Sequence, residues 1–411
     1  MTLFYNIGLS FLRLGFRVAA LFLPKAKAFV DGRKNLFQEI ERAFQGQQGQ
    51  VVWIHCASLG EFEQGRPVIE SLKKERPSVK VLLTFFSPSG YEVRKNYKEA
   101  DYVFYLPWDT SSNAEKFISL TNPTVAIFVK YEFWYHYSME LKSRNIPTIS
   151  ISSIFRDEQL FFKPHGGFYR RILRNFSYFF VQNKASLALL NSIGIDQCLL
   201  AGDTRFDRVN AIVQNGEEIP IAQVFKANEK IVVVGSCWAE DLEVLTPLIN
   251  EGKVKFIIAP HEITETFLQN IERSVRGKAI RYSKSANQNL EDYQVLIIDN
   301  VGLLSRLYRY GEFAYVGGAF GKGLHNILEA ACYGIPIFFG NKSYQRFQEA
   351  TDLIHRGGAF AVGNHLELKE KFEMLNFPEN FLPACEVTRA YVVENLGATE
   401  KIMDYCRKLL K

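Results

Sequence analysis

The chain has 411 residues, of which 47% are hydrophobic, 23% are charged and 14% are aromatic, and its formal net charge is +5. This composition excludes a disordered chain, a collagen-like repeat, a small disulfide-linked scaffold and a polytopic membrane protein. At about 150 residues per domain, the length predicts two or three domains. The six cysteines lack the spacing of a metal site or a disulfide framework, which favours a reducing compartment, and so small a net charge does not indicate nucleic-acid binding.

The first segment, Leu3–Leu23, is almost wholly apolar and is interrupted by Asn6, Ser10, Arg13 and Arg17. These four residues form one narrow polar stripe on a helix, because they are spaced 4, 3 and 4 apart. Arginines are costly at the centre of a bilayer, so the pattern favours a helix that lies in the membrane interface. Residues 1–34 are therefore predicted to be an N-terminal membrane-anchoring helix and a basic segment. The alternatives are a spanning helix, a signal peptide and an ordinary buried helix.

Beyond residue 50, short β-rich apolar runs alternate with amphipathic stretches. Strands are expected at 51–58, 79–87, 103–106, 124–132, 147–151, 178–182 and 198–201, and then at 231–235, 254–259, 295–299, 313–317 and 336–340. Apolar runs on both sides of helices indicate parallel sheets with crossover helices. We therefore expect an α/β fold with two doubly wound, Rossmann-like domains, 35–208 and 231–411, joined by a polar linker at 209–230 and facing each other across a cleft.

Ligands of such sheets bind beyond the carboxyl ends of the strands, so chemistry is expected at the strand exits. At the first exit, Glu61 lies in the first helical turn, where it is either a dipole-stabilised capping acid or a general base. The exit near residue 130 carries Lys130 and Glu132, which form either a functional pair or an ordinary ion pair. Arg205, at a third exit, either pairs with an aspartate in a solvated turn or contacts an anionic ligand.

In the second half, Ser236 follows a strand and His261 ends the next one, where a lone histidine is more often structural than a ligand contact. The most specific segment is 315–331, in which a strand leads through Gly317 and Gly318 into a helix. Backbone N–H groups freed by glycine bind phosphate without a metal. A glycine-rich turn before a capped helix is the alternative.

The same segment carries three polar side chains. His325 and Asn326 are expected in the first turn of the helix, with Glu329 one turn later on the same face. A carboxylate at that position could accept the hydroxyl groups of a ribose. The glycine spacing matches neither a dinucleotide fingerprint nor a P-loop, which disfavours NAD binding and ATP hydrolysis.

Together these segments resemble the motifs of one family. His55–Glu61 resembles "(H/A)xxSxGE", Glu132–Trp134 resembles "ELW(P)", Gly202–Asp207 resembles "G(S/D/N)x(K/R)FD" and Gly317–Ala330 resembles "GGSLxxxGGHNxLEPA" of the 3-deoxy-D-manno-octulosonic acid (Kdo) transferases. Tyr344–Glu349 lies where that family has a further loop motif. The order and spacing hold over nearly the whole chain.

The resemblance implies a GT-B type glycosyltransferase that is inverting and needs neither a metal nor a cofactor. The donor would be CMP-Kdo and the acceptor the lipid A precursor. The enzyme would act at the cytoplasmic face of the inner membrane, without nucleic acid. Implied catalytic residues are Glu61, Glu132 and Arg205. The resemblance implies Ser58 and Gly60 on the acceptor side, and Ser236, His261, Gly317, Gly318, His325, Asn326 and Glu329 at the donor. Lys130, Arg170 and Arg171 are added as acceptor-binding candidates for their charge. Arg170 and Arg171 belong to a basic cluster at 156–174, for which a solvated basic helix is the alternative.

Some positions depart from the family pattern. The family's "PRH" is Ala259–His261 here, so the arginine is missing, and Lys130 is a hypothetical replacement for its charge. Three alternatives stay open: a transferase that uses a UDP-sugar on a lipid, a nucleotide-sugar epimerase, and an inactive binding module with the same fold. The apolar N-terminal segment disfavours the epimerase, and Glu61 together with Glu132 disfavours the inactive module.

Overall fold

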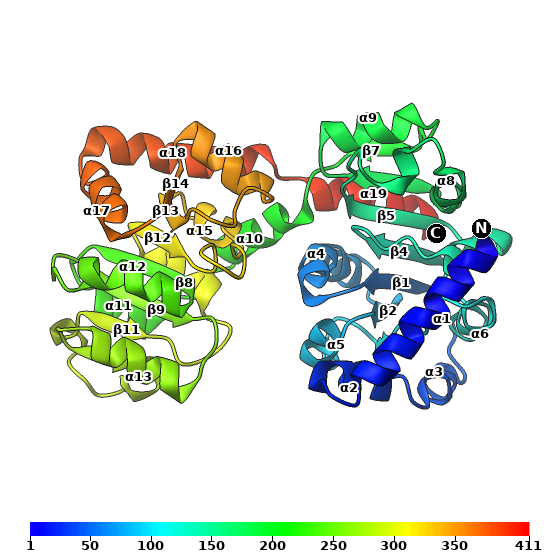
Figure 1. Cartoon of the computed structure of the whole chain (residues 1–411), viewed down its shortest axis with the longest axis horizontal. Coiled ribbons are helices and arrows are strands. Elements are labelled where there is room, and N and C mark those ends of the chain that lie inside the picture. Colours follow the sequence, from blue (N-terminus) through cyan, green and yellow to red (C-terminus); the bar gives the residue numbers. More distant parts are fainter. Residues whose placement is uncertain (411) are drawn as a thin grey trace. The chain divides into compact units, whose positions relative to one another are not determined.

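The computed structural model describes residues 1–410, which form two compact units. Unit 1 comprises Met1–Arg208 together with the segment from Leu396 onward, and unit 2 comprises Val209–Asn395. Each unit is built around its own seven-stranded sheet with helices on both sides (Figure 1). The prediction of two Rossmann-like domains with parallel sheets is therefore confirmed.

The sheet of unit 1 has the order β3-β2-β1-β4-β5-β6-β7, and its pairs are parallel. Its strands are β1 (Val51–Cys56), β2 (Lys80–Phe85), β3 (Tyr102–Tyr105), β4 (Val125–Val129), β5 (Thr148–Ser153), β6 (Tyr178–Val181) and β7 (Cys198–Leu200). The central strands are buried on both faces, which explains their continuous apolar runs. The strand order reverses between β1 and β4, which makes this the switch point where ligands bind in such sheets.

Helices of unit 1 cover both faces of this sheet, whereas the N-terminal helix lies on the surface of the unit. The helices are α1 (Thr2–Ala19), α2 (Pro24–Asp31), α3 (Leu36–Phe44), α4 (Leu59–Glu75), α5 (Pro88–Arg94), α6 (Ser111–Thr121), α7 (Tyr135–Ser143), the 3-10 helix η1 (Leu160–Phe162), α8 (Gly167–Leu173), α9 (Lys184–Ser192) and α19 (Ala398–Leu409). Trp53 and Phe117 belong to the core on one face of the sheet. Phe62 and Ile402 belong to the core on the other face, so the C-terminal helix completes the first unit.

The N-terminal helix α1 lies on the surface of unit 1 (Figure 1) and buries none of its side chains fully. The alternative of an ordinary buried helix is therefore wrong. Tyr5 donates a hydrogen bond to the carboxylate of Asp109, and Asn6 contacts the imidazole of His136 (2.7 Å). Within residues 1–410, the helices are too short or too polar to cross a membrane.

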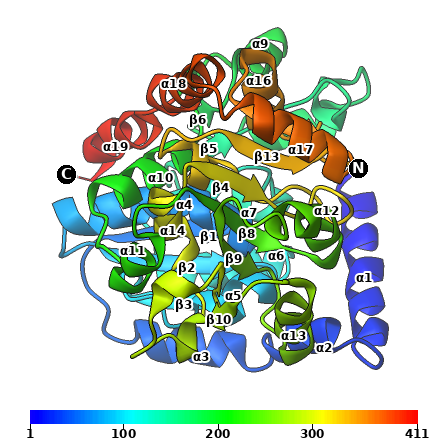
Figure 2. The same cartoon turned by 90° about the vertical axis from the view of Figure 1, so that its left-hand side faces the viewer.

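The sheet of unit 2 has the order β10-β11-β9-β8-β12-β13-β14, again with parallel pairs. Figure 2 labels β13, β8, β9 and β10 of this sheet. Its strands are β8 (Ile231–Cys237), β9 (Lys255–Pro260), β10 (Ala279–Arg281), β11 (Val295–Ile297), β12 (Phe313–Val316), β13 (Ile337–Gly340) and β14 (Ala359–Val362). Its helices are α11 (Pro220–Lys226), α12 (Ala239–Ile249), α13 (Glu265–Ser274), η2 (Tyr282–Lys284), η3 (Leu290–Asp292), α14 (Leu304–Leu307), η4 (Tyr308–Tyr310), α15 (Leu328–Ala331), α16 (Gln348–Arg356), α17 (His365–Met374) and α18 (Pro378–Glu394). Here the switch point lies between β8 and β12.

The predicted domain boundaries need two corrections. The expected linker 209–230 contains the end of α10 (Thr204–Gln214) and all of α11, whose Phe225 is buried in unit 2. The expected second domain does not extend to residue 411, because α19 packs on unit 1. Asp207 holds α19 there by accepting hydrogen bonds from the backbone N–H groups of Gly397 (2.7 Å) and Thr399 (2.6 Å).

Candidate active site

Two predicted site residues, Glu61 and Glu132, lie close to each other at the switch point of unit 1. Glu61 is in the first turn of α4, which follows β1, and Glu132 follows β4, the neighbour of β1. The N–H of Ala57 donates a hydrogen bond to Glu61 Oε2. The indole N–H of Trp134 donates one to Glu132 Oε2 (2.8 Å). The fold therefore brings two carboxylates from separate motifs into one polar site.

The pKa of Glu61 is raised from its ordinary value of 4.5 to about 7. Burial is the main cause, because a carboxylate loses hydration inside a protein, and the negative charge of Glu132 is the second. The N–H groups of Ala57 and Ser58 and the ammonium group of Lys130 partly offset this rise. A carboxyl group with this pKa can accept a proton near neutral pH, as a general base does.

His55 contacts Glu132 and connects it to Thr84 of β2. The sequence motif did not indicate this role. His55 Nε2 lies 3.2 Å from Glu132 Oε2, and its Nδ1 lies 2.9 Å from Thr84 Oγ1. Thr84 in turn accepts a hydrogen bond from the indole N–H of Trp53 (2.8 Å). His55 is fully buried, so this chain of contacts fixes the orientation of the Glu132 carboxylate. A histidine at the end of a fully apolar strand was the available signal.

The predicted acceptor-side residues Ser58, Gly60 and Lys130 border the same two strand exits. Ser58 occupies the N-cap position of α4, and Gly60 is exposed in the first turn. Lys130 has a left-handed backbone conformation (φ 68°), and its Nζ lies 5.4 Å from the centre of the Tyr131 ring. These positions are compatible with the predicted roles, which stay predictions.

Arg205 pairs with the neighbouring Asp203, which was one of its two predicted alternatives, but the turn is not solvated as that alternative expected, because Asp203 is buried. Its Nε and a terminal nitrogen lie 2.9 and 2.8 Å from Asp203 Oδ2, and Gln64 of α4 donates to the same oxygen (3.0 Å). Asp203 is buried, yet its pKa lies below the ordinary value because the charge and hydrogen bonds of Arg205 outweigh the desolvation. This network fastens the segment after β7 to α4, and a contact between Arg205 and a donor stays a prediction.

Arg170 and Arg171 lie on α8. The guanidinium group of Arg170 donates hydrogen bonds to the carbonyl oxygens of Phe161 (3.3 Å), Lys163 (3.1 Å) and Pro164 (3.4 Å). Arg170 therefore holds the loop before α8 in place, whereas Arg171 is exposed. Their predicted acceptor contacts stay predictions.

In unit 2, a buried carboxylate that the sequence did not reveal organises the switch point. Asp241, in the first turn of α12, accepts hydrogen bonds from the hydroxyl of Tyr315 (3.0 Å) and from the backbone N–H groups of Gly318 (2.9 Å) and Trp238 (3.0 Å). Asp241 is fully buried, and desolvation raises its pKa. An aspartate four residues after the end of β8, and three after the N-cap residue Trp238, was the available sequence signal.

The glycines at this exit fit closely against the rest of the site. A methyl group at Gly317 would overlap the backbone carbonyl of Ser236 and the Asp241 carboxylate. Ser236 itself has a left-handed conformation (φ 50°), so its carbonyl approaches Gly317. Gly318 has φ 93° and accepts a hydrogen bond from the N–H of Gly323 (2.9 Å), which closes the glycine-rich loop.

An aromatic stack adjoins this loop. The rings of Trp238 and His261 are stacked with centroids 4.3 Å apart, and those of His261 and His325 are 4.4 Å apart. The indole N–H of Trp238 donates a hydrogen bond to His325 Nε2 (3.2 Å). Burial, reinforced by the charge of His261, lowers the pKa of His325 to about 4, so this imidazole is neutral and can accept that bond. The sequence analysis did not include Trp238 among the candidate site residues, although a tryptophan directly after a strand was an available signal.

The prediction that His325 and Asn326 begin a helix is wrong. The helix α15 begins only at Leu328, and the Asn326 side chain accepts a hydrogen bond from the Leu328 N–H (3.2 Å), which forms a turn before the helix. Asn326 also donates to Glu329 Oε1 (3.2 Å), so these two predicted site residues do lie together.

We expect Gly318→Ala to open the glycine-rich loop and to weaken nucleotide binding at least tenfold. The new Cβ would lie 2.5 Å from the carbonyl oxygen of Gly323, and an L-residue is strained at φ 93°. Gly321→Ala is the matched control, because its methyl group would meet no described atom within 4 Å. Calorimetric titration with CMP measures both, and equal affinities for the two variants would contradict the prediction.

Comparisons with known proteins agree with this arrangement. Residues 34–208 match the family model described as 3-Deoxy-D-manno-octulosonic-acid transferase (kdotransferase). The chain is 28% identical over 333 residues to the 3-deoxy-D-manno-octulosonic acid transferase of Aquifex aeolicus, covering 79% of this chain and 86% of that one. It is 27% identical over 380 residues to the enzyme of the same name from Rickettsia typhi, covering 88% and 79%.

Solved structures share the fold at lower sequence identity. UDP-GlcNAc 2-epimerase from Neisseria meningitidis aligns with a TM-score of 0.63 at 17% identity, covering 88% of this chain and 100% of that one. MurG from Acinetobacter baumannii aligns with a TM-score of 0.56 at 11% identity, with the same coverage. The relatives align over most of the chain, which confirms the predicted resemblance to the Kdo transferases, and their names agree with the prediction of a glycosyltransferase. The two solved structures support the fold alone.

Proposed function

We propose that the chain transfers Kdo from CMP-Kdo to the lipid A precursor, with inversion and without a metal. The observation that carries the proposal is the Glu61–Glu132 pair, in which Glu61 has a pKa of about 7. Relatives named 3-deoxy-D-manno-octulosonic acid transferase support the choice of the transferred sugar. Location at the inner membrane, with peripheral attachment through α1, belongs to the same proposal.

Glu61 takes the proton of the acceptor's primary hydroxyl while that oxygen forms a bond to the anomeric carbon of Kdo. The bond from this carbon to the phosphate oxygen breaks on the opposite face, and CMP leaves with the electron pair. The sugar develops positive charge in between, as in other glycosyl transfers. The negative charge of the Glu132 carboxylate, which His55 and Trp134 hold in place, makes the ionised Glu61 a stronger base. Transfer of the proton to Glu61 relieves the repulsion between the two carboxylates.

The residues of unit 2 support the donor half of the proposal. The N–H groups of the glycine-rich loop can bind the phosphate of CMP, and Asn326 with Glu329 can bind its ribose. The Trp238–His261–His325 stack offers a flat surface next to the loop. Preorganised donors of this kind stabilise a departing phosphate without a metal ion.

The competing function is transfer from a UDP-sugar to a lipid, and nucleotide-dependent thermal stability separates the two. CMP is expected to raise the melting temperature by several degrees in EDTA, whereas UDP leaves it unchanged. Transfer is then measured with CMP-Kdo generated in situ and a tetraacylated lipid A precursor, again in EDTA. Stabilisation by UDP alone, with no Kdo product, would favour the competing function.

A further inference from the structure

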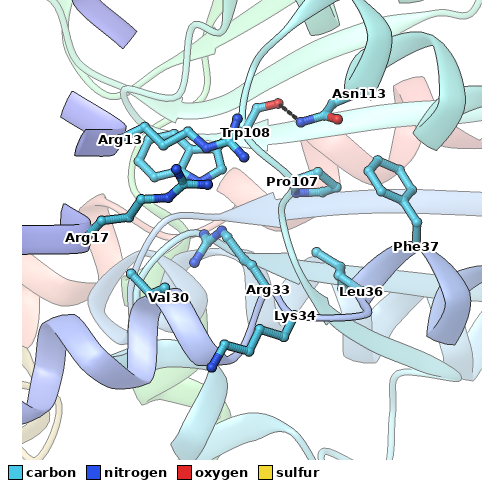
Figure 3. Close-up of a pocket in the computed structure, with 10 residues that line it drawn as sticks. All are labelled: Arg13, Arg17, Val30, Arg33, Lys34, Leu36, Phe37, Pro107, Trp108 and Asn113. Atoms are coloured by element: carbon cyan, nitrogen blue, oxygen red, sulfur yellow. Dashed lines mark hydrogen bonds between the residues drawn. The ribbon is translucent and has the colours of Figure 1, made fainter. Parts of the chain in front are cut away.

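A pocket of about 440 Å³ lies in unit 1 beside α1, apart from the two glutamates (Figure 3). Three arginines line it, Arg13 and Arg17 of α1 and Arg33 after α2, together with Trp108. In Figure 3 the guanidinium groups of Arg13 and Arg17 extend from α1 toward Trp108, and that of Arg33 lies next to them. The pocket is therefore a cluster of cations around one hollow.

Arg33 is built rigidly into the wall of this pocket. Its guanidinium group donates hydrogen bonds to the backbone carbonyls of Phe29 (3.0 Å), Phe86 (2.7 Å) and Leu106 (3.0 Å). It also lies 3.8 Å from the centre of the Phe29 ring and 4.8 Å from that of Tyr105. Burial lowers the pKa of Arg33 to about 9, which still leaves the group charged at neutral pH. These partners are neutral carbonyl groups and aromatic rings, so they supply no negative charge to balance the guanidinium group of Arg33.

Within residues 1–410, carboxylates do not pair with Arg13, Arg17 or Arg33. The nearby carboxylate of Asp31 pairs with Lys34 instead (2.7 Å), and the Lys34 ammonium group points away from the arginines in Figure 3. Three guanidinium groups that line one hollow without a carboxylate partner attract an anion. A phosphate monoester, which carries up to two negative charges and presents three oxygens to a guanidinium fork, fits three arginines better than a diester.

The surroundings of the pocket are apolar, which indicates an amphiphile rather than a free anion. Large side chains of α1 and the turn after it are exposed to solvent: Phe4 (71%), Phe11 (71%), Leu21 (77%) and Phe22 (78%). Between α1, α2 and Phe86 lies a second hollow of about 930 Å³, most of whose lining side chains are apolar. Contact of this apolar surface with water is unfavourable, and acyl chains would remove it from water.

We propose that the arginine pocket binds the phosphate monoester group of a phosphorylated lipid whose acyl chains lie against α1. The site is a discrete phosphate pocket, distinct from diffuse attraction between a basic segment and a charged membrane. The proposal requires no step of the transfer reaction, so it can fail or hold independently of the proposed function.

The test is co-sedimentation of the full chain with phosphatidylcholine vesicles that contain either phosphatidic acid, a monoester, or phosphatidylglycerol, a diester, at matched net charge. We expect the wild-type chain to prefer the monoester vesicles. The double variant Arg13→Gln/Arg17→Gln should bind them at least tenfold more weakly, since each basic residue at a membrane surface contributes measurably to binding. Arg42→Gln/Lys98→Gln, which removes two exposed cations elsewhere on unit 1, should change binding less than about twofold.

Equal affinity of the wild-type chain for both vesicles, or equal loss in both double variants, would overturn the proposal in favour of diffuse charge attraction. Calorimetric binding of inorganic phosphate as tight as that of the monoester vesicles would overturn the lipid assignment. The thermal unfolding midpoint of the Arg13→Gln/Arg17→Gln variant is measured in parallel by circular dichroism. An unchanged value shows that the variant is folded and that the outcome concerns only the pocket.

Discussion

Glu61→Gln is expected to reduce Kdo transfer by a factor of about 10² to 10⁴, the usual contribution of a general base. Glutamine keeps the size of the side chain and still accepts the hydrogen bond from the Ala57 N–H, but it cannot take a proton. Glu63→Gln, two residues further along α4, is the control and should retain activity, because Glu63 pairs with the half-buried Arg66, Arg94 and Arg208. Steady-state transfer rates measure the effect, and a Glu61→Gln variant as active as the control would remove Glu61 from its role.

The same residue predicts two pH dependences. A base must be deprotonated to act, so kcat/KM of the wild-type enzyme should rise with pH through about 7.

The pKa of Glu61 in the folded state exceeds the unfolded value of 4.5, so folding becomes less favourable as the pH rises between these two values. Glu61→Gln should therefore increase the unfolding free energy at pH 8 by about 2–3 kcal/mol and leave it unchanged below pH 4. Urea unfolding at both pH values checks the sign.

Asp241→Ala is expected to destabilise unit 2 by about 3–5 kcal/mol. The substitution would leave the hydroxyl of Tyr315 and the N–H groups of Gly318 and Trp238 without their buried acceptor. The Asp241 carboxylate also joins the ends of β8 and β12, so its removal should abolish binding of CMP as well as lower the stability of unit 2.

Glu243→Ala is the matched control, since Glu243 is exposed on the same helix. It should shift the unfolding free energy by less than about 0.5 kcal/mol. Denaturant unfolding, followed by tryptophan fluorescence and circular dichroism, measures both variants. A loss below 1 kcal/mol for Asp241→Ala would mean that water satisfies these groups and that Asp241 does not organise the site.

Much of the fold was predictable because its signals are local. Runs such as Val51–Cys56 and Phe313–Val316 are apolar on both faces, so a parallel sheet followed from the sequence. Glu61 and Glu132 were singled out because both follow such runs. The helix expected at His325 was wrong, because the chain forms a turn at Asn326, whose side chain accepts a hydrogen bond from the N–H group of Leu328. A glycine-rich segment carries no periodicity that reveals this turn.

The sequence by itself determined which segments become strands, which side chains stand at their exits and which family the chain resembles, since each depends on neighbours within a few residues. Only the tertiary structure decided which exits adjoin, and hence the high pKa of Glu61, which requires burial and the charge of Glu132 from another motif. It also decided that α19 completes unit 1 and that Arg13 and Arg17 meet Arg33 around one pocket. These features join residues far apart in the chain, and the packing that brings them together leaves no local pattern.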